Sequence, residues 1–392
     1  MLLRSTFLTP VQQLFESLVA SWSTQNDIPV EFTWGTFEVL NDTLVSSAST
    51  SAGPDVIQIV NTRPHQFAEA LLDVSDAAEA FAENEGAWYP LARDICQVDG
   101  VWRSMPHFLT PFAMVYREDL FAEVGFDTFP ETWEELLEAG TALKAAGTPI
   151  GFPLGRAQGD GSNFLYSLLW SFGASVTDET GTNIVLDSAE TRDALTYVQQ
   201  LYNDAMDPNV LAWDDGSNNR AMLGGEVSAT VNSASILFAA RNDGLEIADV
   251  INHAKYPMGP AGRIQQIELT STGIMNYAGN TEAAIDMATY FNSPEVWLPL
   301  ARDGFAFFIP AFEGFEENPA MPWNTDPKLA AFKGIARDGA HFGYPGPPTP
   351  EANEVFVNFV INDMFAMVAS GAASIDDAVA QATEAVQDIY EQ

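Results

Sequence analysis

Hydrophobic and polar residues follow helical spacing in some segments of the chain and strand spacing in others. From Pro10 to Trp22 the apolar residues recur every three or four positions, which predicts an amphipathic helix. Residues 28–34 alternate as a strand does, and a more polar helix is expected over 38–51. The apolar run 56–60 is typical of a strand buried on both faces. This order predicts a β-α-β unit and an α/β fold.

The same kind of pattern continues to the end of the chain. Thr132 and Glu135 have the spacing of a capping box, which places the start of a helix over 133–145. An extended stretch is expected over 106–116. Further helices are expected over 118–123, 163–172, 189–204, 218–223, 281–290, 294–302, 327–336, 350–369 and 375–390, and strands over 227–232 and 265–275. The loop 343–350 cannot be regular structure, because its prolines lack backbone donors.

Length and charge narrow the class of protein. A chain of 392 residues is longer than the chains that usually fold around a single hydrophobic core, so two lobes are expected. The 54 acidic residues outnumber the 16 Lys and Arg and give a net charge of -38. Such a charge repels phosphate backbones and anionic head groups, so neither nucleic acid nor a membrane surface is an expected partner. It also suits a saline habitat, where ions screen the self-repulsion. We expect a monomer.

The sequence offers little that indicates catalysis. Cys96 is a single cysteine, which excludes an intrachain disulfide and a multi-cysteine zinc site, and the four histidines lack metal-ligand spacing. No GxSxG, HExxH, GxGxxG or phosphate-loop motif occurs. No stretch reaches the ~18 apolar residues of a membrane span, and the first residues lack the apolar run of a signal peptide. We therefore expect no enzyme, no metal and no cofactor.

Four segments carry a more specific pattern. They are SAGPDVIQI at 51–59, MVYREDLFAEVGFDTFPETWEELLEAGTALKAAG at 114–147, AMLGGEVSATVNSAS at 221–235 and NTEAAIDMATYFNSPE at 280–295. In this order they resemble the family 1 extracellular solute-binding proteins of ABC importers, the group that contains maltose-binding protein. Together these segments span nearly the whole chain.

The resemblance implies a two-lobed periplasmic-binding-protein fold of type II, an α/β fold whose lobes are joined by crossover hinge segments. It implies an N-terminal lobe of residues 1–110 and 265–312, a C-terminal lobe of 111–264 and 313–392, and a ligand cleft between them.

The sequence departs from the family pattern in two places. The family begins with a signal sequence and a first strand, so this chain is expected to be truncated, with that strand and part of the cleft missing. Arg117 and Glu118 replace the family's Asn-Lys, which should alter only the surface.

Recognition residues are expected in loops after strands, because open α/β sheets bind ligands there. Trp34 ends a predicted strand and could stack on a sugar ring, although a core tryptophan is an equal alternative. The loop after strand 56–60 holds an acid and an arginine in the family. Thr62 replaces the acid here, and Arg63 matches the arginine.

Other candidates follow the same reasoning. His107 and Thr110 lie at the first crossover, where the family has a polar contact, but a hinge histidine bonded to backbone is as plausible. Arg156 and Asn163 bracket a glycine-rich loop that leads into a helix N-terminus, where ligand oxygens can meet N–H groups. The alternative for Asn163 is a helix cap.

The last candidates follow the strand 227–232 and the proline-rich loop. Asn232 and Ser235 lie where the family often has an aromatic contact, and Tyr344 is a further stacking candidate. The stretch 213–220 is interpreted as structural, with Asp215 or Ser217 capping the next helix.

The resemblance implies the substrate-binding protein of an ABC transporter, periplasmic or on the cell surface. It would capture a sugar or oligosaccharide by cleft closure and deliver it to the permease subunits. Two alternatives stay open. The ligand could be another polar solute, such as a polyol or a phosphorylated polyol held by Arg63 and Arg156. A carbohydrate hydrolase using two of the many acids is the alternative from another class.

Overall fold

The computed structural model describes residues 1–5, 8–303 and 306–391. It divides into two compact units, each built from two separate stretches of chain. Unit 1 comprises Met1–Pro111 and Glu268–Pro327, and unit 2 comprises Phe112–Ile267 and Lys328–Gln392. None of the described helices has the length and apolar character needed to cross a bilayer.

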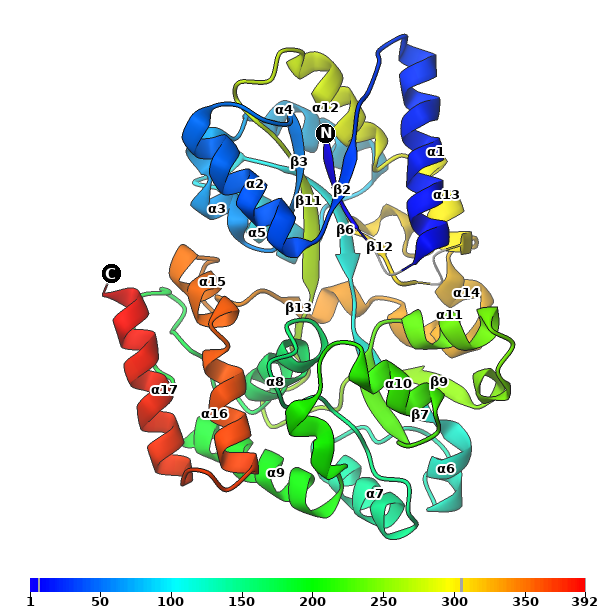
Figure 1. The fold of residues 1–392 in the computed structure, drawn as a ribbon, viewed down its shortest axis with the longest axis vertical. Helices are drawn as coiled ribbons and strands as arrows, with labels where there is room; N and C mark the ends of the chain where they lie inside the picture. The colour runs from blue at the N-terminus through cyan, green and yellow to red at the C-terminus, as the bar shows by residue number, and fades with distance from the viewer. Residues whose placement is uncertain (6–7, 304–305, 392) are drawn as a thin grey trace. The chain divides into compact units, whose positions relative to one another are not determined.

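Unit 1 is organised by a six-stranded sheet in the order β12-β6-β11-β3-β1-β2 (Figure 1). The strands are β1 (Leu2–Arg4), β2 (Thr33–Gly35), β3 (Val56–Val60), β6 (Met105–Thr110), β11 (Glu268–Ile274) and β12 (Ile309–Pro310). β1 is parallel to β2 and β3, whereas β11 is antiparallel to β3 and β6. A strand from the second stretch of chain thus lies inside the sheet.

Helices cover both faces of this sheet. They are α1 (Thr9–Asn26), α2 (Phe37–Thr50), α3 (Arg63–Gln66), α4 (Ser75–Glu85), α5 (Pro90–Cys96), α12 (Thr281–Tyr290), α13 (Pro294–Asp303) and α14 (Pro322–Thr325), with a hairpin of β4 (Gln97–Val98) and β5 (Val101–Trp102). Successive residues of a strand face opposite sides. Leu2 accordingly packs in a cluster with Leu40 of α2, and Leu3 in one with Trp22 of α1.

Unit 2 has a smaller three-stranded antiparallel sheet, in the order β8-β7-β9. Its strands are β7 (Ala113–Arg117), β8 (Ala229–Asn232) and β9 (Ile251–Ala254), and β10 (Gln265–Gln266) pairs separately with β13 (Gly339–Ala340). The helices are α6 (Glu118–Glu123), α7 (Trp133–Ala145), α8 (Asp160–Ser171), α9 (Ala189–Asp204), α10 (Ser217–Leu223), α11 (Ser235–Asn242), α15 (Pro350–Val357), α16 (Val360–Ala369) and α17 (Ile375–Tyr390).

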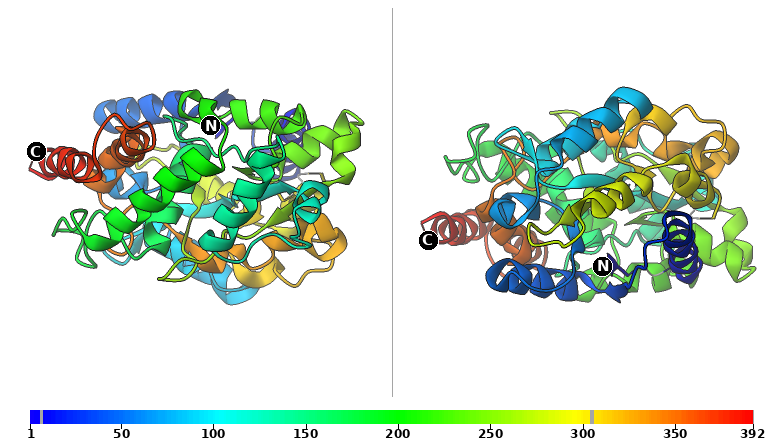
Figure 2. Two further views of the ribbon diagram at one scale, coloured as in Figure 1. Left: turned by 90° about the horizontal axis from the view of Figure 1, so that it is seen from below. Right: turned by 90° about the horizontal axis from the view of Figure 1, so that it is seen from above.

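The core of unit 2 surrounds α8, in which every residue is buried. A helix that is covered on all sides needs neighbours on all sides. α9 and α16 supply part of that cover, and the C-terminal helices α15, α16 and α17 lie side by side (Figure 1 and Figure 2). The last stretch of the chain therefore completes the core that the middle stretch begins.

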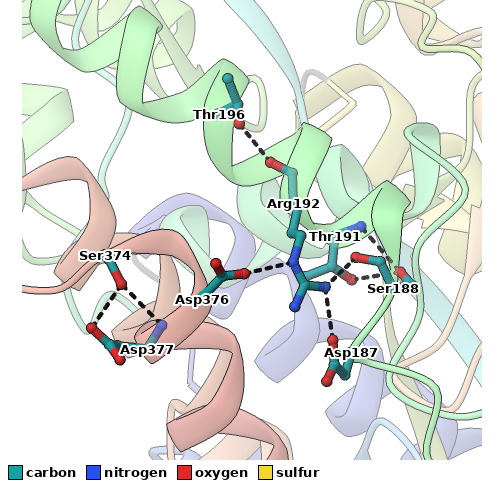
Figure 3. Close-up of polar contacts among 8 residues, drawn as sticks. All are labelled: Asp187, Ser188, Thr191, Arg192, Thr196, Ser374, Asp376 and Asp377. Carbon is teal, nitrogen blue, oxygen red and sulfur yellow. Dashed lines mark hydrogen bonds and ion pairs between the residues drawn. The ribbon is translucent and has the colours of Figure 1, made fainter.

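Side-chain caps and one arginine fix the ends of these helices. Thr132 and Glu135 form the predicted capping box of α7. Ser188 caps α9 and Ser374 caps α17, and Arg192 of α9 donates to Asp376 of α17 at 2.9 Å (Figure 3). Arg192 also donates to Asp187, in the loop before α9, at 2.7 Å, so this partly exposed arginine ties α9 to α17 and to its own preceding loop.

Many predicted segments match the structure, but several do not. The strand expected over 28–34 is confined to β2, because β1 offers only three residues for pairing. The helix expected over 327–336 is two 3₁₀ turns, η5 (Pro327–Phe332) and η6 (Ile335–Asp338), separated where Gly334 adopts φ 67°. The helix expected over 350–369 is broken between α15 and α16, where Phe359 adopts φ 57°. A left-handed residue cannot continue a right-handed helix.

The extended stretch 106–116 also divides: β6 belongs to unit 1 and β7 to unit 2. The first strand, expected to be missing, is present as β1. Residues 313–327, which were assigned to the C-terminal lobe, cluster with unit 1, where Glu316 accepts a hydrogen bond from Tyr89 at 2.8 Å. Residues 265–267, assigned to the N-terminal lobe, cluster with unit 2, because β10 pairs with β13.

Candidate ligand-binding site

The most concentrated polar site of unit 1 lies at one edge of its sheet. β3 and β6 are antiparallel to β11, and β1 is parallel to β3. The carboxyl ends of β1, β3 and β6 therefore lie on the side of the sheet where β11 begins. Thr110, the last residue of β6, is the register partner of Glu268, the first of β11. Ligands of open α/β sheets bind at this kind of edge.

Arg4, at the end of β1, organises this edge. Its Nη1 is 2.5 Å from the Glu268 carboxylate and donates to Thr270 at 3.0 Å and to Thr110 at 3.4 Å. The guanidinium carbon lies 4.5 Å from the ring centroid of Phe37. The side chains of Arg4 and Glu268 are only 10% and 12% exposed, so this is a largely desolvated ion pair. The two charges of the pair cancel each other, and the pair places hydrogen-bonding groups at the sheet edge.

Thr62 follows β3 at the same edge. The backbone N–H of Asn61 donates to the Leu269 carbonyl at 2.8 Å, and Asn61 itself adopts φ 55°, which turns the chain out of the sheet. Thr62 is 2% exposed, and its hydroxyl has no hydrogen-bond partner within the described residues. Arg63 begins α3 and donates to Gln66 at 3.4 Å. A buried hydroxyl of this kind is poised to bond an additional group.

Two other candidates of unit 1 have different surroundings. His107 is completely buried; its Nδ1 is 3.1 Å from Gln58 Nε2, and its ring stacks on Phe291 with centroids 5.1 Å apart. Burial lowers the pKa of His107 to about 3, so the ring is neutral. It packs as a core residue in this structure, and its contact with a ligand stays a prediction. Trp34 is half-buried and donates to Glu16 at 3.1 Å.

Unit 2 gathers Asn232 and Ser235 into one network at the end of β8. Asn232 donates to Asp160 at 3.2 Å and to Asn219 at 2.6 Å, and accepts from Ser235 at 2.6 Å. Asn218 donates to the same Asp160 oxygen at 2.8 Å. The network places a buried carboxylate among amides at the end of β8 and the start of α8.

Asp215 supports this network from outside. Its Oδ1 accepts from the backbone N–H of Gly159 at 3.0 Å and of Asp160 at 3.1 Å. It therefore caps the start of α8, and the interpretation that it caps the following helix α10 was wrong. Ser217 is instead the first residue of α10 and donates to Asp214.

Asn163 is not a helix cap but an internal tie. Its amide nitrogen donates to the Gln266 side chain at 2.6 Å, and its oxygen accepts from Tyr256 at 2.5 Å. Both of its polar ends have partners inside the core of unit 2, and its contact with a ligand stays a prediction. Burial also raises the pKa of Tyr256 well above its usual range.

Arg156 and Tyr344 are separate from the Asp160 network. Arg156 is exposed and forms a two-pronged ion pair with Asp363, at 2.7 and 3.0 Å. The pairing raises the pKa of Arg156. Tyr344 is half-buried, and its ring lies 5.4 Å from that of Trp170. Within the described part of the chain, no hydrogen bond, ion pair or ring contact joins either residue to the network.

The sequence patterns missed Arg4 and Glu268 in unit 1 and Asp160 in unit 2. Arg4 follows two leucines of a three-residue strand, which is too short for a periodicity signal. Glu268 opens β11 inside a longer predicted strand, where its charge is the one available clue. Asp160 lies in the glycine-rich loop that was bracketed by the chosen candidates.

Among residues 1–5, 8–303 and 306–391, no three His, Cys, Asp or Glu side chains come together as a metal site would need. Cys96 is buried, and burial raises the pKa of its thiol to about 12, which disfavours the thiolate that would act as a ligand or nucleophile.

Comparisons with known proteins agree with this architecture. Residues 8–296 match the family described as bacterial extracellular solute-binding protein. A protein of Brucella abortus named only as a binding protein is 23% identical over 83% of this chain and 78% of its own length. A Deinococcus radiodurans protein named as a probable ABC transporter-binding protein is 25% identical over 62% of this chain and 59% of its own.

Solved structures share the fold at low identity. The maltose-bound MalE3 of T. maritima superposes with a TM-score of 0.83 at 22% identity, over 99% of both chains. The sugar-binding protein MalE of Xanthomonas citri gives 0.84 at 18%, over 100% of this chain and 96% of the other. These similarities show the two-lobed solute-binding-protein fold that the sequence predicted. The chain belongs to the family of bacterial extracellular solute-binding proteins.

Proposed function

We propose that this protein is the receptor of an ABC importer that binds a neutral sugar or oligosaccharide outside the cytoplasm, in the periplasm or at the cell surface. Closure of its two lobes on the sugar would present the ligand to the permease, with no covalent step. The observation that carries the proposal is the sheet edge of unit 1. There a neutralised ion pair lies at the same edge as the buried Thr62 hydroxyl, which has no partner among the residues that the structure describes.

Sugar hydroxyls both donate and accept hydrogen bonds, which matches these groups. The Glu268 carboxylate accepts, the Arg4 guanidinium donates, and the Thr62 hydroxyl can do either. On unit 2 the Asp160 network offers amides and a carboxylate of the same kind. MalE3 of T. maritima with maltose and an Arthrobacter chlorophenolicus protein with laminaribiose, both of this fold, support a sugar as ligand.

A phosphorylated polyol is the less favoured ligand. Of the two arginines considered for a phosphate, Arg156 is paired with Asp363 and Arg63 donates to Gln66, and at the sheet edge Arg4 is paired with Glu268. A phosphate would have to displace a carboxylate from Arg156 or Arg4, in a protein of net charge -38. Catalysis is also disfavoured, because the family and the similar structures are binding proteins.

The test is calorimetry with a panel of mono- and disaccharides, a neutral polyol and a phosphorylated polyol, followed by chromatography of the ligand. We expect saturable binding of a neutral sugar and its recovery unchanged after long incubation. Tighter binding of the phosphorylated polyol would replace the proposed ligand class, and release of smaller sugars would establish a hydrolase.

A matched pair of variants tests the site itself. Thr62→Val keeps the shape and removes the unpartnered hydroxyl, so we expect about tenfold weaker sugar binding, or ~1.4 kcal/mol, with unchanged unfolding. Thr272 in β11 also has a buried hydroxyl without a partner among the described residues, but it lies within the sheet. Thr272→Val should leave the sugar affinity unchanged. Equal affinity of both variants and the wild type would remove Thr62 from the site.

A further inference from the structure

Unit 1 contains a cavity that is separate from the carboxyl edge of its sheet. It lies among α1, α4, α12 and α13, has a volume of about 770 Å³, and is lined entirely by residues of unit 1. This is within the range of ~300–1,000 Å³ typical of small-molecule pockets. None of its lining residues belongs to the carboxyl edge of the sheet where Arg4 and Glu268 lie.

The floor of the cavity is apolar, and its walls are acidic. Trp22 and Phe81 are buried rings that line it, and Phe81 is held by stacking on Trp88 with centroids 4.8 Å apart. The carboxylates of Glu85, Asp286 and Glu295 line it from α4, α12 and α13, and all three residues are exposed. Apolar surface and separated negative charges therefore share one space.

Three of the four surrounding helices carry no cation, and Arg302 in the last turn of α13 is the one basic residue of the fourth. Along their full length, α1, α4 and α12 contain no Lys, Arg or His. Their acidic residues are Glu16, Asp76, Glu79, Glu83, Glu85, Glu282 and Asp286. The cavity consequently lies in a locally negative potential, which attracts cations. Burial and then the charge of Glu295 raise the pKa of Tyr290, another lining residue.

Side-chain donors of the lining are largely committed to the protein. The Trp22 indole donates to Asp286 at 2.8 Å, the Asn26 amide to the Trp22 carbonyl at 3.0 Å, and the Asn84 amide to the Ala80 carbonyl at 2.7 Å. The carboxylates and the side-chain amide oxygens of the lining are hydrogen-bond acceptors. The Ser293 hydroxyl, which also lines the cavity, is buried and has no partner among the described residues. An occupant should therefore be a donor.

The arrangement of the carboxylates excludes a compact cation. A divalent metal needs several oxygens converging on one point. Within the described ranges no three acidic or histidine side chains do so, although three acids line this cavity. Positive charges that are spaced apart along a ligand can pair with separated carboxylates, and methylene segments between them can cover the apolar floor.

We propose that this cavity binds a linear aliphatic polyamine, a methylene chain that carries two or more ammonium groups. Each ammonium group has three donors and no acceptor, which complements a wall of carboxylates and amide oxygens. The alkyl segments pack on Trp22, Phe81 and the neighbouring alanines of α4. The site is separate from the sugar site and does not depend on it.

Calorimetry with spermidine at about 0.15 M salt tests the proposal, since this ionic strength screens long-range attraction. The triple variant Glu85→Gln, Asp286→Asn and Glu295→Gln removes the three charges and keeps an acceptor for the Trp22 indole. Its matched control is Glu138→Gln, Glu226→Gln and Glu384→Gln, three exposed acids of unit 2. Both variants lower the net negative charge equally.

We expect one saturable spermidine site in the wild type and in the control, and at least about tenfold weaker binding in the cavity variant. Equal weakening in both variants would mean that spermidine responds to net charge alone, and no saturable binding to the wild type would also overturn the proposal. Matching thermal unfolding and sugar affinity in all three proteins establishes that the variants are folded.

Discussion

Replacing Glu268 by leucine tests the energetic role of the ion pair at the sheet edge of unit 1. The substitution leaves the Arg4 guanidinium in a site where its side chain is only 10% exposed. Removing one partner of a buried pair typically costs about 3–5 kcal/mol. Arg4 keeps its hydrogen bond to Thr270 at 3.0 Å and its contact with the Phe37 ring at 4.5 Å, so we expect the lower limit, about 3 kcal/mol.

The assay is thermal unfolding of the full chain. At roughly 2–4 °C per kcal/mol for a domain of this size class, Glu268→Leu should lower the midpoint of the unit 1 transition by roughly 6–12 °C. The double variant Arg4→Met with Glu268→Leu removes the stranded charge and replaces the pair by apolar side chains of similar volume. It should recover most of the loss, because well-packed apolar pairs often replace buried ion pairs without cost.

An exposed ion pair provides the control. Arg156 and Asp363 pair in unit 2 with side chains that are 67% and 40% exposed, so Asp363→Leu should change the midpoint far less than Glu268→Leu does. Two results would refute the reasoning. One is a small effect of Glu268→Leu, which would mean that water reaches Arg4 freely. The other is a double variant no more stable than the single one, which would mean that the lost packing, not the unpaired charge, sets the cost.

Three further predictions test other parts of the structure. His107 has a folded-state pKa of about 3, below its unfolded value near ~6.5. The unfolded state therefore binds more protons, and the free energy of unfolding should fall as pH drops below about 6.5. His107→Phe, which keeps an aromatic ring, should weaken this dependence in unfolding measured at several pH values. Thr132→Ala removes the capping box of α7 and should cost about 1 kcal/mol in denaturant unfolding, whereas Thr132→Ser should not. Asn232→Ala breaks the network around Asp160 and should weaken sugar binding by about tenfold in calorimetry, a result that an unchanged affinity would contradict.

The sequence by itself determined the local elements with strong signals. The bounds of β3, α6, α7, α9, α12 and α17 agree with those predicted, because hydrophobic period and capping residues act within one or two turns of the chain. The family resemblance supplied the two-lobed fold. Of the site candidates, Thr62 and Thr110 lie at the carboxyl edge of unit 1, and Asn232 and Ser235 share one network.

Tertiary structure decided which polar side chains meet. Arg4 and Glu268 come from opposite stretches of unit 1, and no spacing rule links residues so far apart in the chain. It also decided that His107 and Asn163 are interior residues, since their burial depends on rings and strands contributed by distant segments. Periodicity reports which face of an element is covered. It does not report what covers that face, because the partner is chosen by packing across the whole unit.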